Sequence, residues 1–275
     1  MLEVVTLGTG SPIPDPQRAG AATLVRADGV QLLFDCGRAV VMRLAAAGSL
    51  PLLLDAVLLT HLHSDHTTDL ADVITTRWIM APVESPLPVV GPPGTQRLVD
   101  RTLAMLADDV GYRRDHHADL TWDPSCTVHE VHDGVAWESG GVRVTAAPTD
   151  HRPVAPTVGY RVEVGGRVVA IAGDTVPCAG LDRICAGADV YVQTVLRDDL
   201  VRGVPSPRLQ DVLDYHSTCA DAGRTAARAG AARLVLTHPV PPPAPGTEGE
   251  WVAAAAEHFA GEVVLAHDLW SVTLD

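Results

Sequence analysis

The sequence predicts an α+β fold in which two β-sheets pack together and helices cover their outer faces. Short apolar or alternating runs that are typical of strands occur in both halves of the chain. Segments of helical composition or spacing lie between these runs in each half. No short repeat and no linker divides the 275 residues. We therefore expect one domain over residues 1–275.

The first half opens with a strand over Leu2–Leu7 that breaks at Gly8-Thr9-Gly10. Asp28-Gly29 separates two short strand patterns, residues 22–26 and 31–34, and this spacing predicts a hairpin. The continuous apolar run Ala56–Thr60 is typical of a buried strand. Helices are expected over residues 39–47, 69–80 and 94–110, with a further short strand over residues 88–90.

The middle and second half are expected to alternate in the same way. Residues 111–124 predict a loop, and we interpret residues 77–137 as a lid that shapes a substrate pocket. Gly165-Gly166 indicates a second hairpin between two apolar runs. Ser217 or Thr218 is available as the N-cap of a helix that ends before Gly230. The remaining expected elements are strands over 142–147, 159–164, 167–172, 234–237, 263–266 and 271–274, and helices over 220–229 and 250–260.

The charge balance disfavours a non-specific nucleic-acid binder. The 20 basic residues are all arginine and face 34 acidic residues, which gives a net charge of −14. A long polyanion would therefore meet net repulsion. Five scattered cysteines without a C-x-x-C pair indicate free thiols in a reducing compartment. With no basic leader-like stretch and no run of 18 apolar residues, we expect a cytoplasmic protein.

Four metal-ligand side chains follow the expected strand Ala56–Thr60 within six positions. They are His61, His63, Asp65 and His66. His61 and His63 stand two apart, so an extended backbone would project both to one side. Imidazole and carboxylate groups without a thiolate suit a catalytic Zn²⁺, Mn²⁺ or Fe²⁺ site better than a structural zinc site. The sequence therefore predicts a metal centre at the end of this strand.

Further candidate ligands lie just past the ends of other expected strands. They are His151 after residues 142–147, Asp174 after residues 167–172 and His238 after residues 234–236. The glycine before Asp174 would let the backbone come close to the metal. If these strand ends meet at one rim of the sandwich, they complete two metal sites. Asp35, which also follows a strand, is expected to accept a hydrogen bond from a ligand histidine.

These motifs resemble the metallo-β-lactamase superfamily, and within it the branch of ribonuclease Z-like and arylsulfatase-like hydrolases. The likeness rests on His61-x-His63-x-Asp65-His66 and on the later Asp-His, Gly-Asp-Thr and Thr-His motifs. Gly8-Thr-Gly-Ser-Pro12, Phe34-Asp-Cys-Gly37 and His216-Ser-Thr218 also match the branch. The resemblance covers residues 2 to about 240 and implies an αββα sandwich, consistent with the predicted strands and helices.

The resemblance implies a dinuclear site, most consistent with two Zn²⁺ ions. His61, His63 and His151 would hold the first ion, Asp65, His66 and His238 the second, and Asp174 would bridge them. Two such ions share a water and lower its pKa towards about 7, which supplies a bridging hydroxide. Asp65 could also orient this water. The branch resemblance makes His216 a proton donor to the leaving group; the alternative is a histidine at a helix N-terminus without a chemical role.

The sequence predicts a hydrolase that acts on a small phosphodiester or sulfate ester. A lactone, another carboxylic ester or a β-lactam is the alternative, because the superfamily performs all of these reactions on one metal core. A redox member would bring a flavin domain, for which the chain has no room. Arg113, Arg114 and Arg152 are candidate anion contacts, and the branch implies a homodimer.

The sequence disfavours processing of tRNA 3′ ends by a ribonuclease Z. That family inserts a long basic arm between the ligands matched by His151 and Asp174, whereas these residues are only 23 positions apart here. His238 is followed by Pro239-Val-Pro-Pro-Pro243 instead of the family's Ser-Arg stretch. Without lysine and with a net charge of −14, the chain offers no evident surface for tRNA. We therefore expect no nucleic-acid partner.

Overall fold

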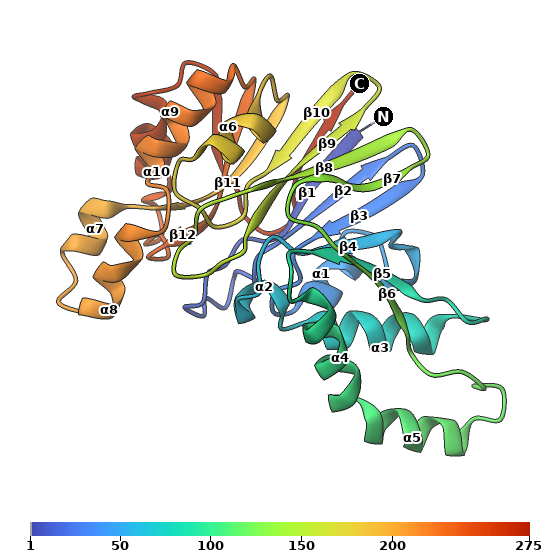
Figure 1. Cartoon of the computed structure of the whole chain (residues 1–275). Helices are drawn as coiled ribbons and strands as arrows, with labels where there is room; N and C mark the ends of the chain where they lie inside the picture. The colour runs from blue at the N-terminus through green and yellow to red at the C-terminus, as the bar shows by residue number, and fades with distance from the viewer. Residues whose placement is uncertain (1) are drawn as a thin grey trace.

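Two seven-stranded mixed β-sheets face each other at the centre of the structure, a computed structural model that describes residues 2–275 (Figure 1). Buried side chains from both sheets form one continuous apolar layer between them, with Phe34 and Tyr160 in ring contact at 5.5 Å across it. Helices cover the outer face of each sheet. The predicted α+β sandwich of four layers is confirmed.

The first sheet has the order β14-β1-β2-β3-β4-β5-β6. Its β14, β1, β2 and β3 pair antiparallel, whereas β3, β4, β5 and β6 pair parallel. Parallel strands need crossovers, and the helices that cover this sheet supply them. The strands are β1 (Leu2–Gly8), β2 (Ala22–Ala27), β3 (Val30–Phe34), β4 (Ala56–Leu58), β5 (Leu87–Gly91), β6 (Cys126–Glu130) and β14 (Trp270–Leu274).

The second sheet has the order β13-β12-β11-β10-β9-β8-β7 and the same division. Strands β7 to β10 pair antiparallel, and β10 to β13 pair parallel. The predicted Gly165-Gly166 hairpin joins β9 to β10, and both glycines adopt positive φ. The strands are β7 (Gly134–Ser139), β8 (Val142–Pro148), β9 (Val158–Val164), β10 (Arg167–Ile171), β11 (Val190–Leu196), β12 (Arg233–Val240) and β13 (Glu262–Leu265).

The helices divide between the two outer faces. Apolar side chains of α1, α3 and α4 pack on the first sheet, and those of α6, α9 and α10 pack on the second. Their bounds are α1 (Val40–Ala46), η1 (Pro51–Leu53), α2 (Ser64–Thr67), α3 (Leu70–Met80), α4 (Thr95–Met105), α5 (Ala107–His116), α6 (Ala179–Cys185), α7 (Asp198–Arg202), α8 (Pro207–Gln210), η2 (Asp211–Asp214), α9 (Cys219–Ala229) and α10 (Glu248–Ala256).

The predicted helix over residues 94–110 and the predicted loop over residues 111–124 are both wrong in their bounds. Two helices, α4 and α5, meet at Leu106, and α5 continues to His116. The Asp109–Arg113 pair, with Oδ2 and Nε 2.8 Å apart, stabilises a helical turn where the polar composition predicts a loop. The helix predicted over residues 250–260 also differs in its bounds, because α10 spans Glu248–Ala256.

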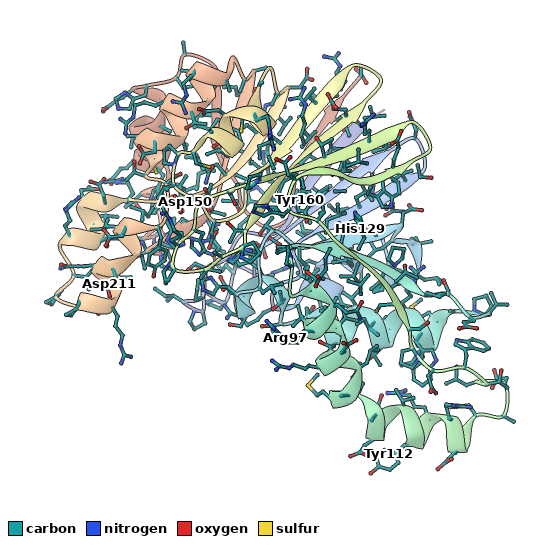
Figure 2. The ribbon with its side chains drawn as sticks, in the orientation of Figure 1. Arg97, Tyr112, His129, Asp150, Tyr160 and Asp211 are labelled. Carbon is teal, nitrogen blue, oxygen red and sulfur yellow. The ribbon has the colours of Figure 1, made fainter. Side chains whose placement is uncertain are left out.

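Much of residues 77–137 belongs to the sandwich itself and not to a lid. Strands β5 and β6 and the start of β7 all lie within this range. Within this range, α5 and the loop after it project from the body, and Tyr112 on α5 lies far from Asp150 (Figure 2). Only α5 and the loop after it therefore remain as the candidate lid within residues 77–137. In residues 2–275 every helix is too short or too polar to cross a membrane.

Candidate metal centre

The predicted ligands come together at one edge of the sandwich. The loop after β4 carries His61, His63, Asp65 and His66, and the latter two fall in the short helix α2. His151 follows β8, Asp174 follows β10 and His238 lies near the end of β12. These side chains form two groups in which the ligand atoms all lie within 4.8 Å of one another. All are buried except His63, which is half-buried.

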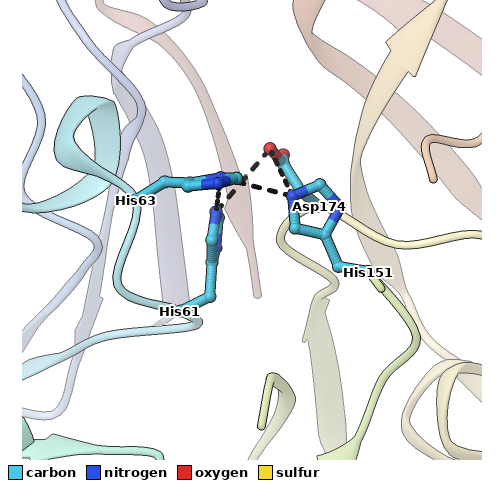
Figure 3. Close-up of side chains that lie close together, drawn as sticks. All are labelled: His61, His63, His151 and Asp174. Carbon is cyan, nitrogen blue, oxygen red and sulfur yellow. Dashed lines mark hydrogen bonds and ion pairs between the residues drawn. The ribbon is translucent and has the colours of Figure 1, made fainter. Parts of the chain in front are cut away.

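The first group joins three imidazoles and Asp174 (Figure 3). His61 Nε2 lies 3.1 Å from His63 Nδ1, and His151 Nε2 lies 3.3 Å from the same atom. Nitrogen ligands about 2.05 Å from a tetrahedral Zn²⁺ ion stand about 3.3 Å apart. These two nitrogen–nitrogen distances therefore fit the edges of a tetrahedral site.

The second group joins Asp65, His66 and His238. Asp65 Oδ2 lies 3.0 Å from His238 Nε2 and 3.5 Å from His66 Nε2. Within the described chain, one buried nitrogen of this group that faces the centre, His66 Nε2, has no hydrogen-bond partner. Buried polar atoms that lack partners carry a large desolvation cost, which a metal ion at this place would offset.

Asp174 stands between the two groups. Its Oδ2 atom has histidine nitrogens of both groups around it, and its Oδ1 atom is buried without a hydrogen-bond partner among the described residues. A carboxylate in this position can offer one oxygen to each of two ions. The Oδ2 distances are 3.2 Å to His216, 3.4 Å to His66, 3.8 Å to His61, and 3.9 Å to both His151 and His238.

Hydrogen bonds at the far side of the rings fix which nitrogen faces the centre. His151 Nδ1 donates to the backbone carbonyl of Tyr215 at 2.8 Å, and His66 Nδ1 donates to Asp35 Oδ2 at 2.8 Å. The lone pair of each Nε2 is thereby directed into the centre. Such outer partners orient metal-bound histidines and raise their basicity.

His61 is held by a two-step chain that begins at Thr60. His61 Nδ1 lies 3.0 Å from Thr60 Oγ1, whose hydroxyl donates to Asp35 Oδ2 at 2.9 Å. Asp35 therefore supports His66 directly and His61 through Thr60. The roles of Thr60 and of the Tyr215 carbonyl had no signal that sequence reasoning detected, because neither residue is itself a ligand type at a recognised spacing.

The electrostatics of the two groups differ. Burial holds the pKa of His61, His63 and His151 below the ordinary histidine value, so these rings are neutral near pH 7 and available as ligands. Burial also opposes charge on His66, but the carboxylates of Asp174 and Asp35 outweigh it and hold its pKa well above the ordinary value. In the absence of a metal, a proton on His66 therefore balances the negative charge of these carboxylates.

The carboxylates respond in the opposite direction. Burial opposes ionisation of Asp174, but His238 and His66 hold its pKa well below the ordinary carboxyl value. Burial likewise opposes ionisation of Asp65, and the hydrogen bond from His238 lowers its pKa. Both acids are therefore ionised at neutral pH and present negative oxygens to the centre.

The backbone at the site adopts uncommon conformations. Asp35 and His238 have φ of 59° and 52°, values that few non-glycine residues adopt. Gly173 has φ of 67°, and a Cβ there would lie 2.6 Å from Thr60 Cβ. Glycine at 173 thus lets the β10 end approach the β4 loop closely enough for Asp174 to reach both groups.

His216 reaches the centre from the segment before α9. Its Nε2 atom lies 3.2 Å from Asp174 Oδ2, and its Nδ1 atom lies 3.2 Å from the backbone carbonyl of Val212. The ring stacks over His238 at a centroid distance of 6.2 Å. The structure therefore places His216 beside the predicted bridging carboxylate, in reach of a reacting group held there.

Comparison with protein families matches residues 31–239 to the β-lactamase superfamily domain. Over its whole length the chain is 56% identical to ribonuclease Z of Mycolicibacterium paratuberculosis, with 100% of this chain and 99% of the relative covered. It is 53% identical to ribonuclease Z of Mycobacterium bovis, with 99% and 98% covered. The chain belongs to the ribonuclease Z branch of the metallo-β-lactamase superfamily.

Solved structures agree with the fold of this branch. The metallo-β-lactamase fold protein YhfI from Bacillus subtilis superposes with a TM-score of 0.76 at 22% identity, covering 98% of both chains. The short form of human tRNase Z superposes with a TM-score of 0.73 at 24% identity, covering 99% of both chains. The protein is thus a metallo-β-lactamase fold hydrolase, and its fold implies two divalent metal ions at the edge that carries both groups.

Proposed function

We propose that this protein is a ribonuclease Z, a metal-dependent endonuclease that removes 3′ trailers from tRNA precursors. The observation that carries the proposal is its 53–56% identity, over 98–99% of their lengths, to relatives named ribonuclease Z. Substrate class changes more readily within a fold than within relatives this similar over their whole length. The histidine and aspartate groups supply a site for the reaction.

The predicted small phosphodiester or sulfate ester substrate is wrong, as are its lactone and β-lactam alternatives and the expected absence of a nucleic-acid partner. The relatives named ribonuclease Z overturn them. The expectation of no nucleic-acid partner rests in part on the absence of a long arm. The alignment with the 56% identical relative spans 277 positions and 99% of that protein, so the relative has no room for a long arm either.

The ligand assignment remains as the resemblance implied, now as part of this proposal. His61, His63 and His151 would hold one divalent ion, Asp65, His66 and His238 would hold the other, and Asp174 would lie within reach of both. Imidazole and carboxylate donors fit Zn²⁺, and Mn²⁺ or Fe²⁺ are the alternatives. When bound, the two ions supply an activated water and neutralise charge on the scissile phosphate.

The chain's own residues then perform the remaining tasks. Asp65, ionised at neutral pH, accepts a hydrogen bond from the attacking water and orients it. His216, whose Nε2 faces Asp174 at 3.2 Å, donates a proton to the ribose oxygen that leaves. Asp35 and the Tyr215 carbonyl keep the histidine rings in place throughout.

A 3′-extended precursor tRNA, incubated with the Zn²⁺- or Mn²⁺-loaded protein, tests the proposal. We expect one endonucleolytic cut near the end of the acceptor stem, resolved on a denaturing gel, and no cut with Asp174→Ala. An uncleaved precursor, with two metal ions bound per chain, would overturn the proposal. A single-stranded RNA of the trailer sequence serves as the control for non-specific nuclease activity and should remain intact.

A further inference from the structure

An open cavity of about 540 Å³ lies directly beside the metal groups and is not used by the mechanism above. Two segments form it, the loop after His151 and the segment from α8 to Tyr215, and His63 connects it to the first metal group. Its volume lies within the range of small-ligand pockets. The lining residues are His63, Arg152, Pro153, Val154, Arg208, Asp211, Asp214 and Tyr215.

Arg208 is the unpaired positive charge of this cavity. Most of the 20 arginines form ion pairs with carboxylates; Arg152, across the cavity, is held by Asp150 through Nε–Oδ1 and Nη2–Oδ2 contacts of 2.9 and 2.5 Å. Arg208 is exposed, and among residues 2–275 its guanidinium has no carboxylate partner. In a chain with a net charge of −14, an unpaired guanidinium beside the metal centre is free to bind a phosphate.

Tyr215 provides an aromatic face in the same cavity. Its side chain is half-buried, and its ring meets the His151 ring edge-on, at a centroid distance of 5.2 Å and an angle of 75°. Contact with this histidine and with His216 restricts the ring. A restricted aromatic ring at the wall of an open cavity is a stacking surface for an unpaired RNA base.

Two carboxylates in the cavity favour a nucleotide over a bare anion as its ligand. Asp211 and Asp214 are both exposed and line the same space as Arg208. They repel a free phosphate, but they accept hydrogen bonds from base amino groups and ribose 2′-hydroxyls. A ligand with one phosphate and several donors therefore complements the cavity better than an inorganic anion does.

We propose that this cavity binds one nucleotide of the RNA next to the scissile phosphate, with Arg208 on its phosphate and Tyr215 stacked on its base. This inference rests on the proposed ribonuclease function and adds the place where the chain holds its substrate. It also explains how a chain without a long arm and with an acidic surface binds RNA: the positive contact is local and adjoins the metal centre.

The test compares four variants of the metal-loaded protein on a precursor tRNA: Arg208→Gln, Tyr215→Ala, Tyr215→Phe and Arg143→Gln. Arg143 is the matched control, because it is an exposed arginine at the start of β8 without a carboxylate partner in the described chain. Arg208→Gln should raise KM about tenfold and reduce the slope of log affinity against log salt by about 0.7 to 0.9. Arg143→Gln should match the unmodified protein in both.

Tyr215→Ala should weaken RNA affinity about tenfold or more, and Tyr215→Phe should restore most of the loss because it keeps the ring. Metal content, measured for each variant, shows whether the neighbouring His151 has been disturbed. Cleavage by the unmodified protein, together with an Arg208→Gln variant that behaves like Arg143→Gln, would overturn the nucleotide subsite and leave the function standing. A precursor left intact by the unmodified protein would instead overturn the function.

Discussion

The Oδ2 atom of Asp35 lies 2.8 Å from Nδ1 of His66, and this contact links a residue after β3 to a metal-ligand candidate in α2. Asp35 also accepts from the backbone N–H of Thr60 at 2.7 Å. One buried carboxylate therefore holds both the start of the His61–His66 loop and the ring of its last histidine. The geometry of the second metal group depends on it.

Replacing Asp35 by asparagine should weaken metal binding about 10- to 100-fold. The amide nitrogen would face the Nδ1–H of His66 or, after rotation, the donors of Thr60, so one donor loses its acceptor in either orientation. Competition with a chromogenic chelator measures the affinity. Asp72→Asn, which removes an exposed carboxylate from α3, is the control; equal affinities of the two variants would refute the role of Asp35.

Metal affinity should rise with pH through the raised pKa of His66. Below that pKa the metal-free protein holds a proton on this ring, since Asp174 and Asp35 favour its charged form in spite of burial. A binding ion must displace the proton, so each displaced proton makes the affinity change about tenfold per pH unit. Calorimetry in buffers of different ionisation enthalpy, between pH 6 and 8, counts the protons released. Affinity independent of pH would contradict this account.

His216→Ala should keep two bound metal ions and slow cleavage mainly where the leaving group needs a proton. Nε2 of His216 lies 3.2 Å from Asp174 Oδ2, which places the ring where it can reach a departing oxygen. Loss of a general acid costs about 10²- to 10⁴-fold for a ribose alkoxide, and less for p-nitrophenolate, which leaves without protonation. The measurement compares, for His216→Ala and the unmodified protein, the rate of RNA cleavage with the rate of hydrolysis of a p-nitrophenyl phosphodiester. Full activity on RNA would rule out the proton-donor role.

Thr218→Ala should lower the free energy of unfolding by about 1 kcal/mol. Thr218 Oγ1 accepts from Asp221 N–H at 3.0 Å, and Thr218 N–H donates to Asp221 Oδ2 at 3.1 Å, which completes a capping box at α9. Urea titration measures the loss. Thr247→Ala at the start of α10 is a suitable control, because its side chain makes no cap hydrogen bond and only an exposed one to the Ala244 carbonyl at 2.8 Å, so it should cost less.

Asp221, at the start of α9, should make the free energy of unfolding depend on pH in acid. Burial opposes ionisation of Asp221, but hydrogen bonds from Thr218 and Arg224 outweigh it and lower its pKa. Its folded pKa lies below the unfolded value of about 3.9, so its contribution is complete above that value and is lost as the pH falls through the folded pKa. Asp221→Ala should therefore destabilise the protein more at pH 7 than in acid below about pH 3.9. Unfolding curves at the two pH values distinguish this from a purely steric effect.

The sequence by itself determined the layer architecture and the place of the metal groups. Apolar runs such as Ala56–Thr60 must be buried on both faces, and turn residues such as Gly165-Gly166 define where the chain reverses, so these signals are local. The four ligand-type residues of His61–His66 are likewise adjacent in the chain. Their chemistry could be recognised before any contact was known.

Only the tertiary structure decided which distant groups meet. Sequence reasoning detected neither the Tyr215 carbonyl that orients His151 nor the cavity between Arg152 and Arg208, because each depends on how separate segments pack. The net charge of −14 is a sum over the whole surface and does not reveal the unpaired charges beside the site, such as Arg208. Helix α5 was likewise missed from the sequence. Its polar composition is typical of a loop, but the Asp109–Arg113 ion pair stabilises it as a helix.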